Sequence, residues 1–179
     1  MRPTESLEKL ASGLRAGPDE EAHAAVAILV KPNDDDLELF LVKRAEATGD
    51  PWSGDMAFPG GKKMPEDRGL VDTVAREVLE ETGIDLRGAA AMGYMEPLFS
   101  SVRKTLRVQP IIYSFQEKPE VHLNYELTRY MWAPLNALRK SRCQTVIKGW
   151  EGPVFRIDGE VVWGLTYRML EMILEMLED

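Results

Sequence analysis

Two neighbouring stretches of the sequence decide the fold: residues 60–67, which read Gly-Gly-Lys-Lys-Met-Pro-Glu-Asp, and residues 76–84, which read Arg-Glu-Val-Leu-Glu-Glu-Thr-Gly-Ile. The first predicts a glycine turn, and the second predicts a helix that carries Glu77, Glu80 and Glu81. Positions i, i+3 and i+4 of a helix share one face, so the three carboxylates are expected side by side. Because clustered anions repel each other unless a cation lies among them, the pattern indicates a metal site.

The alternative is that these glutamates form an ordinary solvated helix face, as acidic residues at helical spacing usually do. Two features argue against it. Arg76 can reach Glu80 but leaves Glu81 unpaired, and like charges at this spacing destabilise a helix by about 0.2 to 0.5 kcal/mol. Gly83 also predicts the end of the helix, which places the glutamates in the last turn, where the helix dipole disfavours anions. An arrangement this unfavourable locally indicates a function that overrides local stability.

The pattern resembles the Nudix box, G-x5-E-x7-R-E-U-x-E-E-x-G-U, in which U is a bulky aliphatic residue. The residues that match in type and order are Gly61, Arg76, Glu77, Val78, Glu80, Glu81, Gly83 and Ile84. Asp67 stands where the first glutamate is expected, and eight residues instead of seven separate it from Arg76. This longer gap resembles the coenzyme A diphosphatase branch of the family, whose boxes commonly begin GG-x-x-D-P-x-D. Pro65 and Asp67 fit that form, whereas Met64 replaces the expected acid.

Further resemblance to this branch lies outside the box, which itself covers about residues 60–84. The upstream signature of the branch is close to L-L-T-x-R-S-x-x-L-x-x-H-P-G-x-x-x-F-P-G-G. Arg44, Gly54 and the run Phe-Pro-Gly-Gly at 58–61 agree with it, but Trp52-Ser53 replaces the histidine-proline pair. Residues 162–166, Val-Trp-Gly-Leu-Thr, look like the I-W-G-x-T segment of the branch. The resemblance extends from about residue 22 to about residue 172.

The resemblance implies an α/β fold, a Nudix-type α/β/α sandwich with a central mixed β-sheet, and the order of expected elements suits the same class. Apolar and β-branched runs predict strands over residues 22–30, 37–42, 92–99 and 107–115. Residues 154–163 are expected to form a hairpin around Asp158-Gly159, and residues 166–177 a closing helix. A short amphipathic helix over residues 6–14 falls in an N-terminal helical extension of residues 1–21. The whole chain, 1–179, is expected to be a single domain.

The metal follows from the ligand types. The ligand set implied by the resemblance is Glu77, Glu80 and Glu81, with the Gly61 carbonyl oxygen as a further candidate. The chain has two histidines, His23 and His122, and neither stands in a metal-ligand spacing, which disfavours zinc. An all-oxygen site favours Mg²⁺ or Mn²⁺ as the cofactor.

The resemblance also suggests catalytic roles. Arg76 is expected to brace Asp67 or Glu77 through a bidentate contact, because a planar guanidinium suits a carboxylate. A general base is harder to place, and Glu77, Glu80 or a carboxylate from a distant loop could serve. Glu126 is the candidate from a distant loop, because it precedes residues 132–135 (Trp-Ala-Pro-Leu) at the spacing of the family's loop glutamate. A solvated loop residue is the competing interpretation of Glu126.

Substrate-binding groups are expected around the glycine turn. Arg44 and the pair Lys62-Lys63 could hold phosphate groups, or they could be ordinary surface charges. Trp52 and Phe58 flank the turn and could stack on an adenine or lie in the core, and for Phe58 the core is favoured.

Composition limits the class of protein. The chain has 179 residues, a net charge of -8 and 44% hydrophobic residues. An acidic chain is a poor general nucleic-acid binder, because that binding relies on clustered lysine and arginine. The single cysteine, Cys143, excludes an internal disulfide framework, and the first residues, Met-Arg-Pro-Thr-Glu-Ser, lack the apolar core of a signal peptide. We therefore expect a soluble cytoplasmic protein with no membrane partner.

Three functions remain open from the sequence. The first is hydrolysis of coenzyme A or its thioesters to 3′,5′-ADP and 4′-phosphopantetheine. The second keeps the metal-dependent diphosphatase chemistry but acts on ADP-ribose, NADH or a nucleoside triphosphate. The third is a catalytically silent Nudix-fold module that binds nucleotides or regulates. The intact cluster of Glu77, Glu80 and Glu81 argues against the third, and the sequence leaves open whether the chain forms a homodimer.

Overall fold

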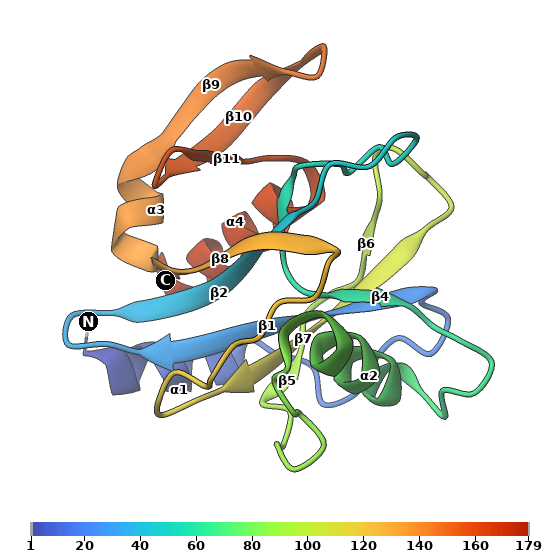
Figure 1. The fold of residues 1–179 in the computed structure, drawn as a ribbon. Helices are drawn as coiled ribbons and strands as arrows, with labels where there is room; N and C mark the ends of the chain where they lie inside the picture. The colour runs from blue at the N-terminus through green and yellow to red at the C-terminus, as the bar shows by residue number, and fades with distance from the viewer. Residues whose placement is uncertain (1, 179) are drawn as a thin grey trace.

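The computed structural model describes residues 2–178, which fold into two β-sheets with helices packed around them (Figure 1). The first sheet is formed by β1 Ala24–Pro32, β2 Leu37–Arg44, β3 Met56–Ala57, β4 Gly60–Lys62, β5 Gly93–Tyr94, β6 Leu98–Phe99, β7 Arg107–Ser114 and β8 Leu127–Pro134. The second sheet is formed by β9 Arg142–Ile147, β10 Trp150–Ile157 and β11 Glu160–Val162. The helices are α1 Pro3–Ser12, α2 Leu70–Thr82, α3 Leu135–Ser141 and α4 Gly164–Glu178.

The first sheet is mixed and carries helices on both faces, which confirms the expected α/β/α sandwich. Strand β1 pairs in parallel with β7 and antiparallel with β2 and β4. Side chains along β1 alternate between two apolar clusters, because successive residues of a strand point to opposite faces. Ala25, Ala27 and Leu29 pack in the cluster that contains α2, and Ile28 and Val30 pack in the cluster that contains α1 and α4. Both faces of β1 are therefore buried.

One strand expectation is wrong. Residues 92–99 do not form one strand; they form the two short strands β5 and β6, each paired with a different part of β7. Pro97 lies between them and has no N–H to donate to a ladder, so the backbone leaves the sheet there.

The hairpin around Asp158-Gly159 is confirmed, and both turn residues have positive φ, 48° and 78°. Sequence reasoning did not foresee that β10 starts at Trp150 and pairs on its other side with β9, through a second tight turn at Lys148-Gly149.

Helix α2 is held at its C-terminal end by a remote loop. Gly83 ends the helix in the left-handed conformation, φ 74°, and its N–H donates to the Leu79 carbonyl oxygen at 2.9 Å. The N–H of His122 then donates to the Thr82 carbonyl oxygen at 2.8 Å, and that of Asn124 to the Glu81 carbonyl oxygen at 3.0 Å. The segment after residue 120 is thereby fixed against the end of the helix that carries the glutamates.

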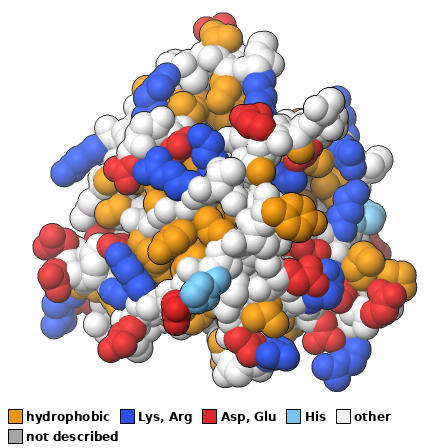
Figure 2. All heavy atoms as spheres, viewed as in Figure 1, with side chains coloured by type: hydrophobic (Ala, Val, Ile, Leu, Met, Phe, Trp, Pro, Cys, Tyr) orange, Lys and Arg blue, Asp and Glu red, His pale blue; other side chains and the backbone are white. Residues whose placement is uncertain are grey.

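Over residues 2–178, none of the helices combines the length and apolar character needed to cross a membrane. On the face shown in Figure 2, lysine and arginine side chains are interspersed with aspartate and glutamate.

Candidate functional site

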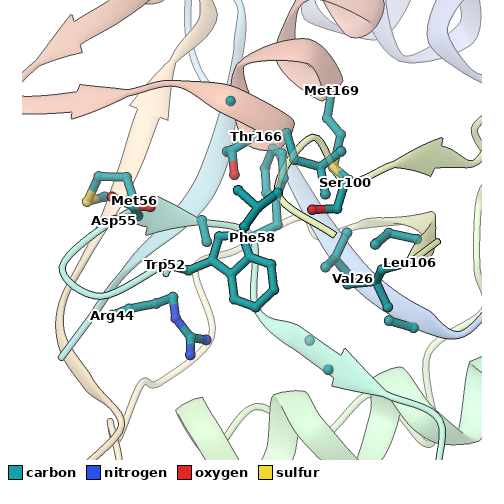
Figure 3. A pocket seen from close by; sticks show the side chains of 18 of the residues that line it. Val26, Arg44, Trp52, Asp55, Met56, Phe58, Ser100, Leu106, Thr166 and Met169 are labelled. Atoms are coloured by element: carbon teal, nitrogen blue, oxygen red, sulfur yellow. The ribbon is translucent and has the colours of Figure 1, made fainter. Parts of the chain in front are cut away.

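A cavity of about 340 Å³ opens where β1, β4, α2 and the start of α4 approach one another. One part of its wall is charged and includes Arg44, Lys62 and glutamates of α2. Figure 3 shows Arg44 on one side and Val26, Leu106 and Met169 on the other, with Trp52 and Phe58 between them. The cavity thus has a charged end and an apolar end.

The glycine turn brings the backbone of β4 into close contact with α2. A Cβ added to Gly61 would lie 2.5 Å from Cδ of Glu77, so only glycine leaves room for the present position of this carboxylate. Gly60 has φ 153°, and a Cβ there would collide with the Ala25 backbone. The Gly60 N–H donates to Oε2 of Glu81 at 3.2 Å. The two glycines therefore position Glu77 and Glu81, the two glutamates of α2 that line the cavity.

The three glutamates of α2 have different environments. Glu81 is buried, with 4% of its surface exposed, and burial, together with the negative charges of Glu77 and Glu126, raises its pKa to about 8. The hydrogen bond from Gly60 and the positive charge of Arg44 oppose that rise. The Glu77 side chain is 18% exposed and also lines the cavity, whereas the Glu80 side chain is 59% exposed and is not part of the lining. A buried carboxylate among other carboxylates is poorly stabilised as an anion unless a cation is bound nearby.

Arg76 joins the glycine turn to the helix. Its Nε and Nη2 donate to the two oxygens of Asp67 at 3.0 and 2.8 Å, and its Nη1 donates to Oε1 of Glu77 at 2.8 Å. Hydrogen bonds from Arg76 are the largest influence on Asp67 and hold the pKa of that carboxyl well below its usual range, helped by the Met64 N–H and the Thr73 hydroxyl. Arg76 thus contacts both of its expected partners, Asp67 and Glu77. Its Nη1 also lies 3.9 Å from Oε2 of Glu80.

Glu126 reaches the same cavity from a distant part of the chain. Its carbonyl oxygen accepts the N–H of Ala45 at 2.8 Å, and its N–H donates to Oδ1 of Asn124 at 2.9 Å. Since Asn124 is itself bonded to the end of α2, the loop places Glu126 in the cavity wall with Glu77 and Glu81.

Of the expected substrate-binding residues, Arg44, Trp52, Phe58 and Lys62 line the cavity, whereas Lys63 does not. Arg44 donates from Nη2 to Oδ2 of Asp50 at 2.7 Å, and its buried Nε has no hydrogen-bond partner in the part of the chain that is described. Trp52 is half-buried, and the Arg103 guanidinium lies 5.2 Å from its ring centroid. Phe58 is 4% exposed and belongs to the core cluster as well as to the cavity wall. Lys62 lies exposed at the charged end.

The residues fit a hard divalent cation, although residues 2–178 contain no preformed cluster of three metal-ligating side chains. Glu77 and Glu81 offer carboxylate oxygens in one cavity, and Gly61 leaves the space beside Glu77 open. An all-oxygen donor set of this kind suits Mg²⁺ or Mn²⁺. Glu80 is the one expected carboxylate ligand that lies outside the cavity lining.

Sequence reasoning missed most of the apolar end. Val26, Leu106 and Met169 come from β1, from the loop before β7 and from α4, and no local pattern connects them. It also missed Asp55, whose side chain is 11% exposed in the cavity wall and accepts the Trp163 Nε1–H at 3.1 Å.

Comparison with known proteins gives a family and a fold. The model of the NUDIX domain matches residues 21–148. The uncharacterized Nudix hydrolase NudL of Yersinia enterocolitica is 28% identical over 166 residues, which cover 84% of this chain and 79% of that protein. The mitochondrial coenzyme A diphosphatase NUDT8 of Mus musculus is 27% identical over 135 residues, 69% of this chain and 63% of that protein.

Among solved structures, the MutT protein of Methanosarcina mazei superposes with a TM-score of 0.59 at 21% identity. The match covers 90% of this chain and all of that one, and at this identity it supports the fold alone.

Proposed function

The chain belongs to the Nudix family of hydrolases, which act on nucleoside diphosphate-linked substrates, and we propose that its own substrate is coenzyme A or an acyl-CoA. Water would be added across the P–O–P bond, giving 3′,5′-ADP and 4′-phosphopantetheine. The observation that carries this proposal is that one cavity holds two carboxylates, Glu77 and Glu81 beside the glycine turn, and also an apolar wall. In that wall Val26, Leu106 and Met169 lie across the cavity from Arg44 (Figure 3). A diphosphate fits the carboxylate end, and the uncharged pantetheine arm, or an acyl chain beyond it, fits the apolar wall.

Two further findings support this substrate. The relative from mouse is named a coenzyme A diphosphatase, and its match covers about two thirds of each chain. The box of this chain also has the longer gap between Asp67 and Arg76 and the run Phe58–Gly61 that resemble this branch.

We assign the metal-holding role to Glu77 and Glu81, with Glu80 and the Gly61 carbonyl oxygen completing the set. A divalent cation held there would lower the pKa of bound water and neutralise charge on the diphosphate oxygens. Arg76 fixes the Glu77 carboxylate through its 2.8 Å hydrogen bond, and so acts as a positioning residue.

The remaining groups bind substrate or move a proton. Arg44 and Lys62 hold the phosphate oxygens at the charged end, because both cationic side chains line the cavity. Glu126 accepts the proton of the attacking water, because it is an exposed carboxylate in the same wall. Trp52 offers an aromatic face for the adenine, whereas Phe58 forms part of the apolar wall.

A second candidate substrate is a nucleotide without a pantetheine arm, such as ADP-ribose or NADH. It is favoured by Trp52-Ser53, which replaces the histidine-proline pair of the coenzyme A branch and places a large aromatic ring at the cavity.

The test is incubation of the pure protein with Mg²⁺ or Mn²⁺ and each of coenzyme A, ADP-ribose, NADH and the nucleoside triphosphates, with products separated by mass. Glu81→Gln is the variant that must lose turnover. Release of 3′,5′-ADP from coenzyme A by the parent alone is the expected result. Turnover of another substrate only would favour the second candidate, and no turnover of any would favour the silent binding module.

A further inference from the structure

The tip of the β9–β10 hairpin fastens the loop that forms one wall of the cavity. Nζ of Lys148 donates to the Ser53 carbonyl oxygen at 2.7 Å, to Oδ1 of Asp55 at 2.8 Å and to the Pro51 carbonyl oxygen at 3.4 Å. One lysine thus contacts three oxygens of the segment 51–55, which also carries Trp52. This hairpin belongs to the second sheet, and its tip and the loop lie toward the same end of the molecule (Figure 1).

Asp55 connects this contact to the cavity itself. Its Oδ1 accepts both Nζ of Lys148 and Nε1–H of Trp163, and the side chains of Asp55 and Trp163 both line the cavity. Nζ of Lys148 lies 5.8 Å from the ring centroid of Trp163, and Trp150, the first residue after the hairpin turn, lies against the same ring at 5.4 Å. Hairpin tip, loop and the wall before α4 therefore meet at one carboxylate.

The backbone of Lys148 offers an independent indication. Lys148 and Gly149 form the two-residue turn of the hairpin, and Lys148 has φ 49°, in the left-handed region. Asparagine, aspartate and glycine suit such turns, and a lysine held there is strained. The other hairpin of the same sheet uses Asp158-Gly159 at the equivalent place. Turn chemistry therefore does not account for Lys148, whereas its three side-chain contacts do.

We propose that Lys148 is a positioning residue that, through Asp55 and the carbonyl groups of residues 51 and 53, holds the segment 51–55 in its substrate-binding arrangement. These three contacts of Lys148, with Pro51, Ser53 and Asp55, are called the Lys148 clasp below. The clasp sets the position of Trp52 and of the cavity wall, and it takes no part in the chemistry at Glu77 and Glu81. It therefore acts on substrate binding more than on turnover, and that kinetic part of the inference rests on the proposed function.

The turn supplies a variant that separates the clasp from folding. Lys148→Asn removes the amine and places asparagine in a turn that prefers it, so the melting temperature is expected to stay or to rise. Lys148→Arg keeps a donor of similar reach and should behave nearly as the parent protein does. Lys140→Asn, the same change at an exposed lysine of α3 that does not line the cavity, is the matched control.

Two readouts decide the proposal. Hydrogen exchange should become about fivefold faster in the segment 51–55 of Lys148→Asn and stay unchanged in the core strands. With the substrate found in the panel, KM should rise about fivefold while kcat changes by less than twofold. A fivefold effect corresponds to about 1 kcal/mol, the upper end for an ion pair at this exposure.

Unchanged exchange in the loop, or faster exchange throughout the molecule, would overturn the clasp. Faster exchange in the loop with an unchanged KM would overturn its role in substrate binding. The exchange measurement needs no turnover, so a protein that cleaves none of the panel would refute the proposed function while the clasp is still tested.

Discussion

Gly61→Ala is the substitution that tests the geometry of the site most sharply. Gly61 lies in β4 and pairs with Ala25, with a backbone conformation that alanine can also adopt. The added methyl group would lie 2.5 Å from Cδ and 2.6 Å from Oε1 of Glu77. The backbone of β4 is fixed by its pairing with β1, so the glutamate side chain is what must move.

The size of the effect follows from that distance. Carbon atoms in contact lie at about 3.5 Å, so the Glu77 carboxylate must shift by about 1 Å. A displacement of this size at a catalytic group costs about 100-fold in rate, or about 2.7 kcal/mol of barrier. Stability should change by less than about 1 kcal/mol, because the clash is with the end of a flexible side chain. Gly60→Ala is unsuitable for this purpose, since its methyl group would meet the Ala25 backbone.

The assay measures kcat/KM on the cleaved substrate, Mn²⁺ affinity by calorimetry and unfolding in urea. Gly88→Ala is the matched control, because a Cβ at Gly88 meets nothing within 4 Å. The expected result is a loss of about 100-fold in kcat/KM and a weaker Mn²⁺ affinity for Gly61→Ala alone. If Gly61→Ala kept kcat/KM within threefold of the parent and bound Mn²⁺ equally well, the placement of Glu77 at the metal would be refuted.

Three further substitutions test separate parts of the molecule. Arg76→Lys loses the bidentate contact with Asp67 and should lower kcat/KM about tenfold. Arg68→Lys, at an exposed arginine, is the control and should leave kcat/KM unchanged. Equal kcat/KM values for the two variants would contradict the positioning role of Arg76. Glu126→Gln should lower kcat at least 100-fold with Mn²⁺ affinity unchanged, and full activity would exclude Glu126 as the base. Tyr113→Phe removes a buried hydroxyl that has no hydrogen-bond partner among the described residues, and should stabilise the fold by about 1 kcal/mol in urea at pH 7. Burial raises the pKa of Tyr113 to about 12, above its unfolded value, so the parent loses stability between about pH 10 and 12; at pH 11 that loss is about 1.4 kcal/mol, and Tyr113→Phe should be spared it.

Local sequence patterns predicted the strands that are strongly apolar and the helix whose end is marked by a glycine. The strand at 22–30 was predictable because six of the seven residues 24–30 are buried, and the end of α2 because Gly83 takes the left-handed conformation. Strand β9 gave no such signal. None of its residues is fully buried, since exposed and half-buried side chains alternate along it, and its pairing with β10 is what makes it a strand.

In the candidate site, too, some contacts could be predicted from the sequence and others could not. Asp67, Arg76 and Glu77 stand within eleven residues of one another, and their contacts could be expected from spacing and charge alone. The unequal burial of Glu80 and Glu81 could not, because it depends on how closely β4 packs on the helix. Contacts such as that of Lys148 with Asp55 join residues 93 positions apart, and no local rule selects such a pair.

Part of the cavity wall comes from residues beyond the region that the family model matches. The carboxylate end falls within residues 21–148, where that model matches, and so do Val26 and Leu106 of the apolar end, whereas Trp163 and Met169 come after it. In the proposed function Glu77 and Glu81 hold the metal, whereas the wall determines the fit of a substrate arm. Changes after residue 148 should therefore alter which substrate is cleaved while the dependence on the metal stays the same. The Lys148 clasp lies where these two parts meet, which is why a binding effect without a chemical one is its expected signature.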